Sequence, residues 1–83
     1  MSDKAKIYET VMDILADVTG DEVVKEEPDI NLPEEGLIDS LGYIELLLDI
    51  EESLGIVIAP TEYTREEMDT PAKIAAVVQS KAE

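Results

Sequence analysis

Apolar residues recur every three or four positions in three stretches of the chain, the spacing of one face of an α-helix. The stretches are 7–19, 40–54 and a segment that begins at Pro71. Gly20 and Gly55 are suited to end the first two helices. The side chains expected to face the core from the first helix are Ile7, Val11, Ile14, Leu15 and Val18. Asp3 or a nearby polar residue is a candidate start for that helix.

Residues 21–39 show no sustained period and contain two prolines and a glycine. Apolar residues are nevertheless placed along the whole stretch, so we expect a long loop packed against the core. A short helical turn is expected at 23–26. After the central helix, 56–58 is expected to be an extended linker that ends at Pro60 and directs its side chains to the core.

A short helix is predicted over 61–68, with Tyr63 and Met68 pointing inward. The last helix then begins with Thr70 as its N-cap and Pro71 as its first residue. Its apolar side is expected to consist of Ile74, Ala75, Val77 and Val78. The 83 residues are expected to form one all-α domain over 1–83, a small four-helix bundle of three main helices, one short helix and a long first loop.

The central helix carries two apolar faces when its residues are placed at about 100° intervals. One face has no charged residue and is expected to meet the core; it comprises Tyr43, Leu46, Leu47, Ile50 and Leu54. The other mixes apolar with acidic side chains, and it comprises Leu41, Ile44, Glu45, Leu48, Glu51 and Glu52. Buried unpaired carboxylates are costly, so we expect this second face to be exposed. The alternative is that the long loop covers Ile44 and Leu48.

Composition removes several classes of function. The chain has no Cys and no His, and its net charge is −15. A disulfide framework, a thiolate metal site and a nucleophilic triad are therefore not expected. Nucleic acid would be repelled, whereas a partner with a basic patch would be attracted. Residues 29–34 have Pro33 in the fifth position of a calcium loop and lack its glycine, so no metal site is expected.

The N-terminal residues are polar and contain no apolar signal-peptide core, and no run is long enough to span a bilayer. We therefore expect a cytoplasmic protein.

Ser40 is the candidate chemical site, because it stands where the polar segment meets the central helix. The first N–H groups of a helix and its dipole favour a phosphate at this position. The alternative is that the Asp39-Ser40 pair serves only as a helix cap. We expect Asp39 to cap the helix and Ser40 to bear a phosphate-linked group. A plain acidic interaction module and a calcium-responsive domain are the competing interpretations.

Four motifs carry a resemblance to a known family. They are GLIDSL at 36–41, DILADVTG at 13–20, EGLIDS at 35–40 with LLL at 46–48, and REEMDTPAKI at 65–74. Together with the acidic four-helix layout they resemble the acyl carrier protein family. Within that family the chain is most similar to the D-alanyl carriers of teichoic acid modification in Gram-positive bacteria. The resemblance covers about 7–81.

The resemblance implies a carrier without catalytic activity. A phosphopantetheinyl transferase would attach 4′-phosphopantetheine to Ser40 from coenzyme A with magnesium, with Asp39 close to the attachment. A D-alanine ligase would load D-alanine as a thioester, and a membrane-bound acyltransferase would receive it for lipoteichoic acid. Leu41, Ile44 and Glu45 would meet these partners, and the carrier would be a monomer. The alternative cargo is a fatty acyl or another acyl or aminoacyl group.

Overall fold

Helices make up all the regular structure of the computed structural model in its described residues, 4–59 and 61–82. They are, in chain order, α1 (Lys4–Thr19), α2 (Val23–Glu26), α3 (Ser40–Leu54), the 3₁₀ helix η1 (Arg65–Met68) and α4 (Pro71–Ala82). The expected all-α bundle with three main helices is confirmed. Asp3 and Pro60, to which a helix start and a linker end were assigned, lie outside the described residues. The single-domain assignment stays a prediction.

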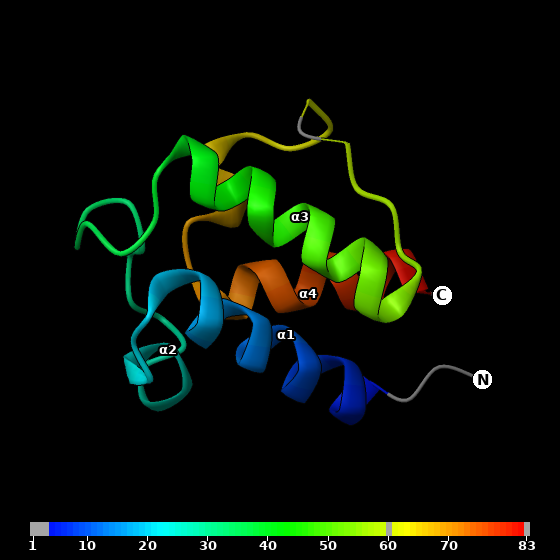
Figure 1. Ribbon diagram of the computed structural model, residues 1–83, viewed down its shortest axis with the longest axis horizontal. Coiled ribbons are helices and arrows are strands. Elements are labelled where there is room, and N and C mark those ends of the chain that lie inside the picture. Colours follow the sequence, from blue (N-terminus) through cyan, green and yellow to red (C-terminus); the bar gives the residue numbers. More distant parts are fainter. Residues whose placement is uncertain (1–3, 60, 83) are drawn as a thin grey trace.

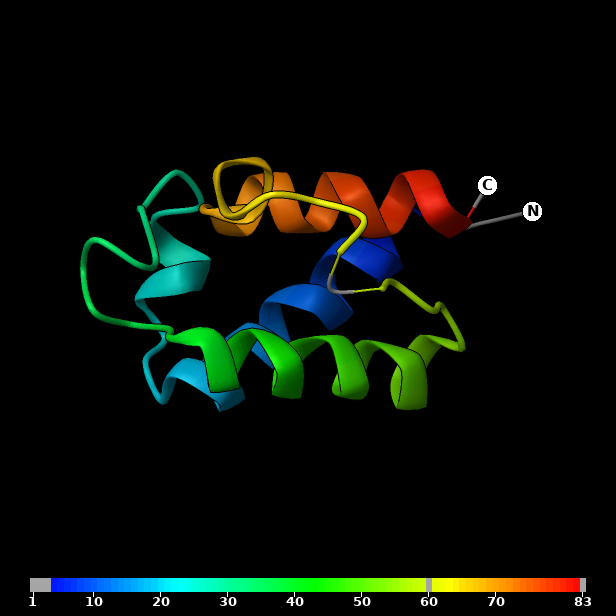
Figure 2. The ribbon, with the colours of Figure 1, turned by 90° about the horizontal axis from the view of Figure 1, so that it is seen from above.

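The helix α1 is the element against which the others assemble. It packs against α3, α4 and the short α2, and Figure 1 shows α3 and α1 on either side of α4 in projection. Viewed from above, α3 and α4 lie apart, and α1 crosses between them on the side away from the viewer (Figure 2). On the side that faces the viewer lies η1, which packs against α4. Residues 55–59 and 61–68 therefore form the side of the bundle opposite α1.

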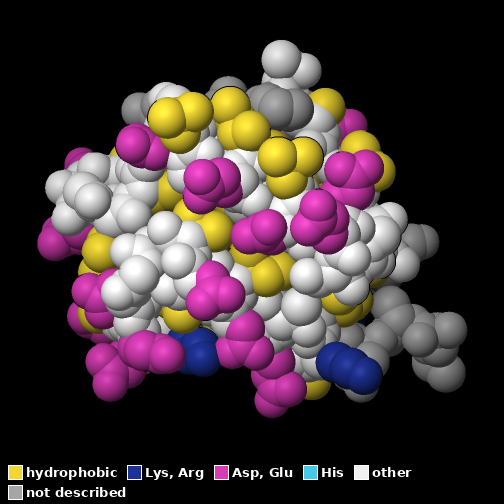
Figure 3. Space-filling view, viewed as in Figure 1, with side chains coloured by type: hydrophobic (Ala, Val, Ile, Leu, Met, Phe, Trp, Pro, Cys, Tyr) yellow, Lys and Arg dark blue, Asp and Glu magenta, His cyan; other side chains and the backbone are white. Residues whose placement is uncertain are grey.

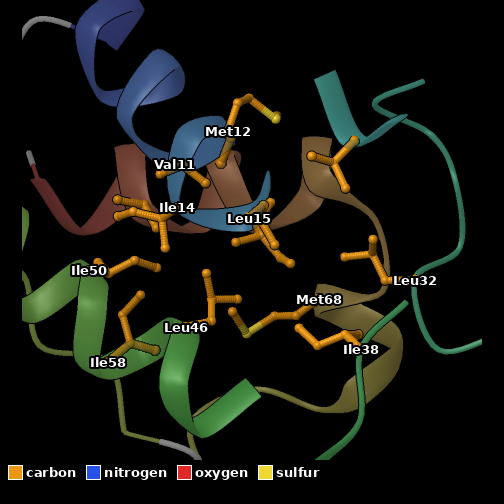
Figure 4. Close-up of a cluster of buried hydrophobic side chains, with 14 of the residues drawn as sticks. Val11, Met12, Ile14, Leu15, Leu32, Ile38, Leu46, Ile50, Ile58 and Met68 are labelled. Carbon is orange, nitrogen blue, oxygen red and sulfur yellow. The ribbon is translucent and has the colours of Figure 1, made fainter. Parts of the chain in front are cut away.

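The core consists of apolar side chains from every element, and Figure 4 shows those of α1 meeting those of α3. No polar side chain is buried among the described residues. The buried residues are Ile7, Val11, Met12, Ile14, Leu15, Val24, Leu32, Ile38, Leu46, Ile50, Ile58, Met68, Pro71, Ile74, Ala75 and Val78. The side chains predicted to point inward are confirmed: Tyr43, Leu47, Leu54, Tyr63 and Val77 are partly buried against this core.

The long first loop packs against the core, as predicted. It contains the expected helical turn, α2, and it buries Leu32 and Ile38. The Leu32 N–H donates to the Asp69 carbonyl at 2.8 Å, and the Ala72 N–H donates to the Pro28 carbonyl at 2.9 Å. These bonds tie the loop to the start of α4. The loop is thus held by both apolar burial and backbone hydrogen bonds.

The ends of the main helices follow local chemistry. Gly20 and Gly55 adopt φ of 72° and 68°, and their N–H groups close the last turns of α1 and α3. The hydroxyl of Thr70 accepts from the Lys73 N–H at 3.2 Å, which confirms its capping role. The apolar period placed α1 from Ile7, whereas the described helix already includes residues 4–6, and the candidate start at Asp3 lies outside the described residues. The first turn of α1 is exposed at Lys4, Ala5 and Lys6, so it carries no apolar signal.

Two predictions about 56–68 are corrected. The short helix spans only Arg65–Met68, because Thr64 begins it with a capping box. In that box Thr64 accepts from the Glu67 N–H, and the Glu67 carboxylate accepts from the Thr64 N–H at 3.0 Å. In the linker, Ile58 is buried but Val57 is 65% exposed. An extended chain sends successive side chains to opposite sides, so three consecutive residues cannot all reach the core.

Candidate functional site

The start of α3 is capped by Asp39, as the sequence predicted. Asp39 has an extended backbone, and its Oδ1 accepts from the Gly42 N–H at 2.8 Å. Its carbonyl accepts from the Tyr43 N–H at 3.0 Å. Ser40 is therefore the first residue of the helix and its side chain is exposed. A substituent on its hydroxyl would lie at the positive end of the α3 dipole.

The loop before α3 fixes the direction in which the chain enters the helix. Asn31 Oδ1 accepts from the Glu34 N–H at 3.0 Å, and Gly36 turns the chain with a φ of 71°. Ile38 is then buried two residues before Ser40. A Cβ added to Gly42 would lie 2.7 Å from Ile38 Cγ1. Gly42 thus lets Ile38 pack beneath the first turn, which positions Ser40 from below.

The second face of α3 is exposed, which confirms the sequence expectation. Leu41, Ile44 and Leu48 expose 71%, 48% and 52% of their surface. The alternative that the long loop covers Ile44 and Leu48 is wrong. The acidic residues of this face are exposed as well, namely Glu45, Glu51 and Glu52. Figure 3 shows apolar and acidic side chains intermingled on the upper part of the molecule, where α3 lies.

These residues do not all lie close to Ser40. With a rise of about 1.5 Å per residue, Leu41, Ile44 and Glu45 lie within about 8 Å of Ser40 along the helix axis. Leu48 lies about 12 Å along the axis, and Glu51 and Glu52 about 17 Å or more. The fold therefore joins the first three residues to the serine in one site. It places the last two at the opposite end of the same face.

The ion pairs of the described residues lie away from α3. Lys25 Nζ contacts Asp13 at 2.7 Å, and this hydrogen bond, with a second to Glu22, raises the pKa of Lys25. Lys81 Nζ contacts Glu62 at 2.7 Å, and Lys73 Nζ contacts Asp69 at 3.0 Å. Within the described part of the chain, no such pair includes an acidic residue of α3. The negative charge of this helix is therefore available to a cationic partner.

An apolar pocket of about 340 Å³ opens beside Ser40, between α3 on one side and Ala59 and residues 63–68 on the other. Its walls include Tyr43, Leu47, Tyr63 and Met68. The sequence interpretation missed this pocket because it assigned both tyrosines to the core. The sequence signal that indicates such a pocket is the hydroxyl group of each tyrosine. A hydroxyl on a partly buried ring needs a polar partner or a wet edge.

The described residues include no group of three acidic side chains that could hold a metal ion. In the same part of the chain, every helix is too short or too polar to cross a membrane.

Most of the chain matches known proteins in sequence. Residues 9–78 match the family described as "Phosphopantetheine attachment site". A D-alanyl carrier protein of Abiotrophia defectiva is 49% identical over 73 residues, which cover 88% of this chain and 92% of that protein. One of Lacticaseibacillus rhamnosus is 47% identical over 79 residues, 95% of this chain and 96% of that protein. One of Bacillus subtilis (strain 168) is 50% identical over 64 residues, 77% and 82%.

Proposed function

We propose, because this chain belongs to the phosphopantetheine attachment family and within it to the D-alanyl carrier proteins, that Ser40 bears its prosthetic group, 4′-phosphopantetheine. The observation that carries this assignment is an exposed serine at the first position of a capped helix. The positive end of the helix suits the phosphate, and the apolar pocket beside it suits the arm. The bound group supplies the terminal thiol that holds the cargo as a thioester. The chain itself has no thiol, because it contains no Cys.

In the attachment step the carrier supplies only the hydroxyl of Ser40. The Ser40 oxygen forms a bond to the phosphorus of coenzyme A's phosphopantetheine, loses its proton, and the adenosine bisphosphate leaves. A phosphopantetheinyl transferase with magnesium performs this step. Asp39 supports it indirectly, because its carboxylate holds the Gly42 N–H and keeps the helix start in place. The carrier has no catalytic activity of its own in this proposal.

The proposed cargo is D-alanine, delivered for D-alanylation of lipoteichoic acid. Support comes from relatives named D-alanyl carrier proteins that are about half identical over most of the chain. A D-alanine ligase loads the cargo in the cytoplasm, and a membrane-bound acyltransferase receives it there. A fatty acyl cargo is the alternative outcome of the loading test below.

The proposed docking surface for these three enzymes is the second face of α3. Its apolar side chains, Leu41, Ile44 and Leu48, would enter apolar depressions of a partner. The exposed carboxylates of Glu45, Glu51 and Glu52 would meet a basic rim. Each enzyme must reach either Ser40 or the arm that it bears, so one shared surface that extends along α3 from Ser40 would serve all three.

Intact-protein mass spectrometry tests the attachment. The purified chain, treated with a phosphopantetheinyl transferase and coenzyme A, should gain the mass of one phosphopantetheine. Ser40→Ala should abolish the gain, whereas Ser53→Ala, an exposed serine of the same helix, should keep it. Modification that survives Ser40→Ala would overturn the assignment. No modification of the unaltered chain would favour the non-carrier interaction module.

The cargo is tested on the modified protein. D-alanine ligase with ATP and D-alanine should add one alanyl group, which hydroxylamine releases as expected for a thioester. A fatty acyl synthetase supplied with the same carrier should leave it unloaded. Efficient fatty acyl loading without D-alanyl loading would replace D-alanine by the alternative cargo.

A further inference from the structure

We infer that Tyr43 determines how large a cargo this carrier can shelter, because its side chain lines the pocket beside Ser40 and holds α3 to η1 by a hydrogen bond. The inference rests on the proposed attachment at Ser40. It concerns the seam between α3 and η1, which is the side of the bundle where the pocket opens. A short cargo needs no space inside the bundle, whereas a long acyl chain needs the core to part at this seam.

The closure is a hydrogen bond that crosses the seam. Tyr43 reaches out from α3, and its hydroxyl donates to the Met68 carbonyl at the end of η1, at 2.8 Å. The Met68 side chain is buried, and Figure 4 shows it pointing toward Leu46 and lying near Ile38. Tyr43 therefore links α3 to the backbone of Met68, and the side chain of Met68 is part of the core. Separating α3 from η1 would require this bond to break.

On its other side, η1 is fastened to α4 and to the long loop. Lys73 Nζ donates to the Glu66 carbonyl at 3.0 Å and also contacts the Asp69 carboxylate. The backbone of Asp69 accepts from the Leu32 N–H, and its carboxylate accepts from the Asn31 amide at 3.3 Å. With η1 anchored there, the seam with α3 is the place where the bundle can open. The Tyr43 bond spans that place.

The pocket is small as long as the bond holds. Its volume is about 340 Å³, and fully buried residues such as Leu46 and Ile50 fill the space beneath α3. Because protein interiors are close-packed, a longer acyl chain could enter only if α3 and η1 moved apart. The pocket thus accommodates the arm or a short group next to Ser40 and leaves a long chain in solvent.

Cargo shielding tests this inference directly. The transferase attaches acetyl- or octanoyl-phosphopantetheine from the corresponding acyl-coenzyme A, and hydroxylamine cleavage of each thioester is timed. In the unaltered protein the two thioesters should be cleaved at similar rates. In Tyr43→Phe the octanoyl thioester should be cleaved about threefold more slowly than the acetyl thioester, the change in open fraction that loss of one hydrogen bond produces. Tyr43→Ala should give a larger difference.

The matched control is Tyr63→Phe. Tyr63 lines the same pocket, but within the described residues its hydroxyl makes no hydrogen bond. This variant should behave as the unaltered protein. Simple destabilisation would change both thioesters alike, so the ratio of the two rates distinguishes a specificity role from a structural one. Equal ratios in the unaltered protein, Tyr43→Phe and Tyr43→Ala would overturn the inference, as would an effect of Tyr63→Phe as large as that of Tyr43→Phe.

A second measurement uses the chain without its prosthetic group. Amide hydrogen exchange at Glu67, whose N–H bonds the Thr64 carbonyl within η1, should accelerate in Tyr43→Phe. Exchange at Gly55, at the far end of α3, should not change. Failure of Ser40 to accept the arm would refute the proposed function and leave this test intact. Unchanged exchange at Glu67 would refute the closure by Tyr43 even if loading succeeds.

Discussion

The two faces of α3 place the same residue types in opposite environments. Leu46 and Ile50 are fully buried, whereas Leu48 and Leu41, on the same helix, expose 52% and 71% of their surface. The first pair meets α1, which packs against α3, and the second pair lies among exposed glutamates. The difference teaches that apolar character alone does not define a core. Leucines without charged neighbours on their face become buried in the core, whereas leucines interspersed with charged residues stay exposed at the surface.

Apolar side chains that stay exposed to water, as on the second face of α3, do not contribute their burial free energy to folding. Burying a leucine or isoleucine side chain contributes about 1.5–3 kcal/mol. For Leu41, Ile44 and Leu48, much of that free energy is still available when a partner covers them. The buried face thus supplies the stability of the bundle, and in the proposed function the exposed face supplies affinity for a partner. The following substitutions separate these two contributions.

The largest effect should come from Leu46→Ala, compared with Leu48→Ala. Leu46 is fully buried, so its truncation leaves a cavity and should lower the free energy of unfolding by about 2–5 kcal/mol. Leu48 is half exposed, and its truncation should cost about 0.5 kcal/mol or less. Urea denaturation followed by circular dichroism measures both. Equal losses in the two variants would break the distinction between the faces.

Leu41→Ala should have the second largest effect, on partner recognition. We expect kcat/KM for loading by D-alanine ligase to fall about tenfold, the effect of removing a central apolar contact. The free energy of unfolding should stay the same within about 0.5 kcal/mol because Leu41 is exposed. Val57→Ala is the control, since Val57 is 65% exposed but lies outside α3. A similar loss in both variants would mean that loading does not depend on this face.

Glu45→Gln should have a smaller effect that depends on salt. Removing one charge near Ser40 should slow loading about two- to threefold at low ionic strength, because an attractive rim contact raises the association rate. The difference should shrink at high salt, where exposed charges are screened. Glu9→Gln, an exposed acid on α1, should change loading little. A salt-independent difference would argue against an electrostatic role for Glu45.

The smallest effect concerns an acid outside α3 that has a basic partner. The hydrogen bond from Lys81 lowers the pKa of Glu62 below its usual 4.5. A carboxyl with a depressed folded-state pKa stabilises the fold above its unfolded pKa, and that stabilisation is lost as pH falls through the folded value. Glu62→Gln should therefore be slightly less stable at neutral pH, and the difference should vanish in acid. Urea titrations at both pH values measure it, and Glu52→Gln, in the exposed acidic face, should not show this loss.

Much of the site followed from local chemistry. The cap by Asp39, the place of Ser40 at the helix start and the two faces of α3 depend on residues within a few turns of one another. Helical periodicity and capping act over the same short range, so they could be predicted. The start of α1 and the extent of η1 could not, because an exposed polar turn and a four-residue 3₁₀ helix have no periodic signal.

The sequence by itself determined the helices, the capped serine and the acidic frame around the exposed leucines. The tertiary structure decided what lies beside that serine. Tyr43 and Met68 are 25 positions apart, and their hydrogen bond exists because the chain returns over the bundle to place η1 against α4. The pocket next to Ser40 has the same origin. Contacts between distant segments depend on how the helices pack, and no local pattern along the chain encodes them.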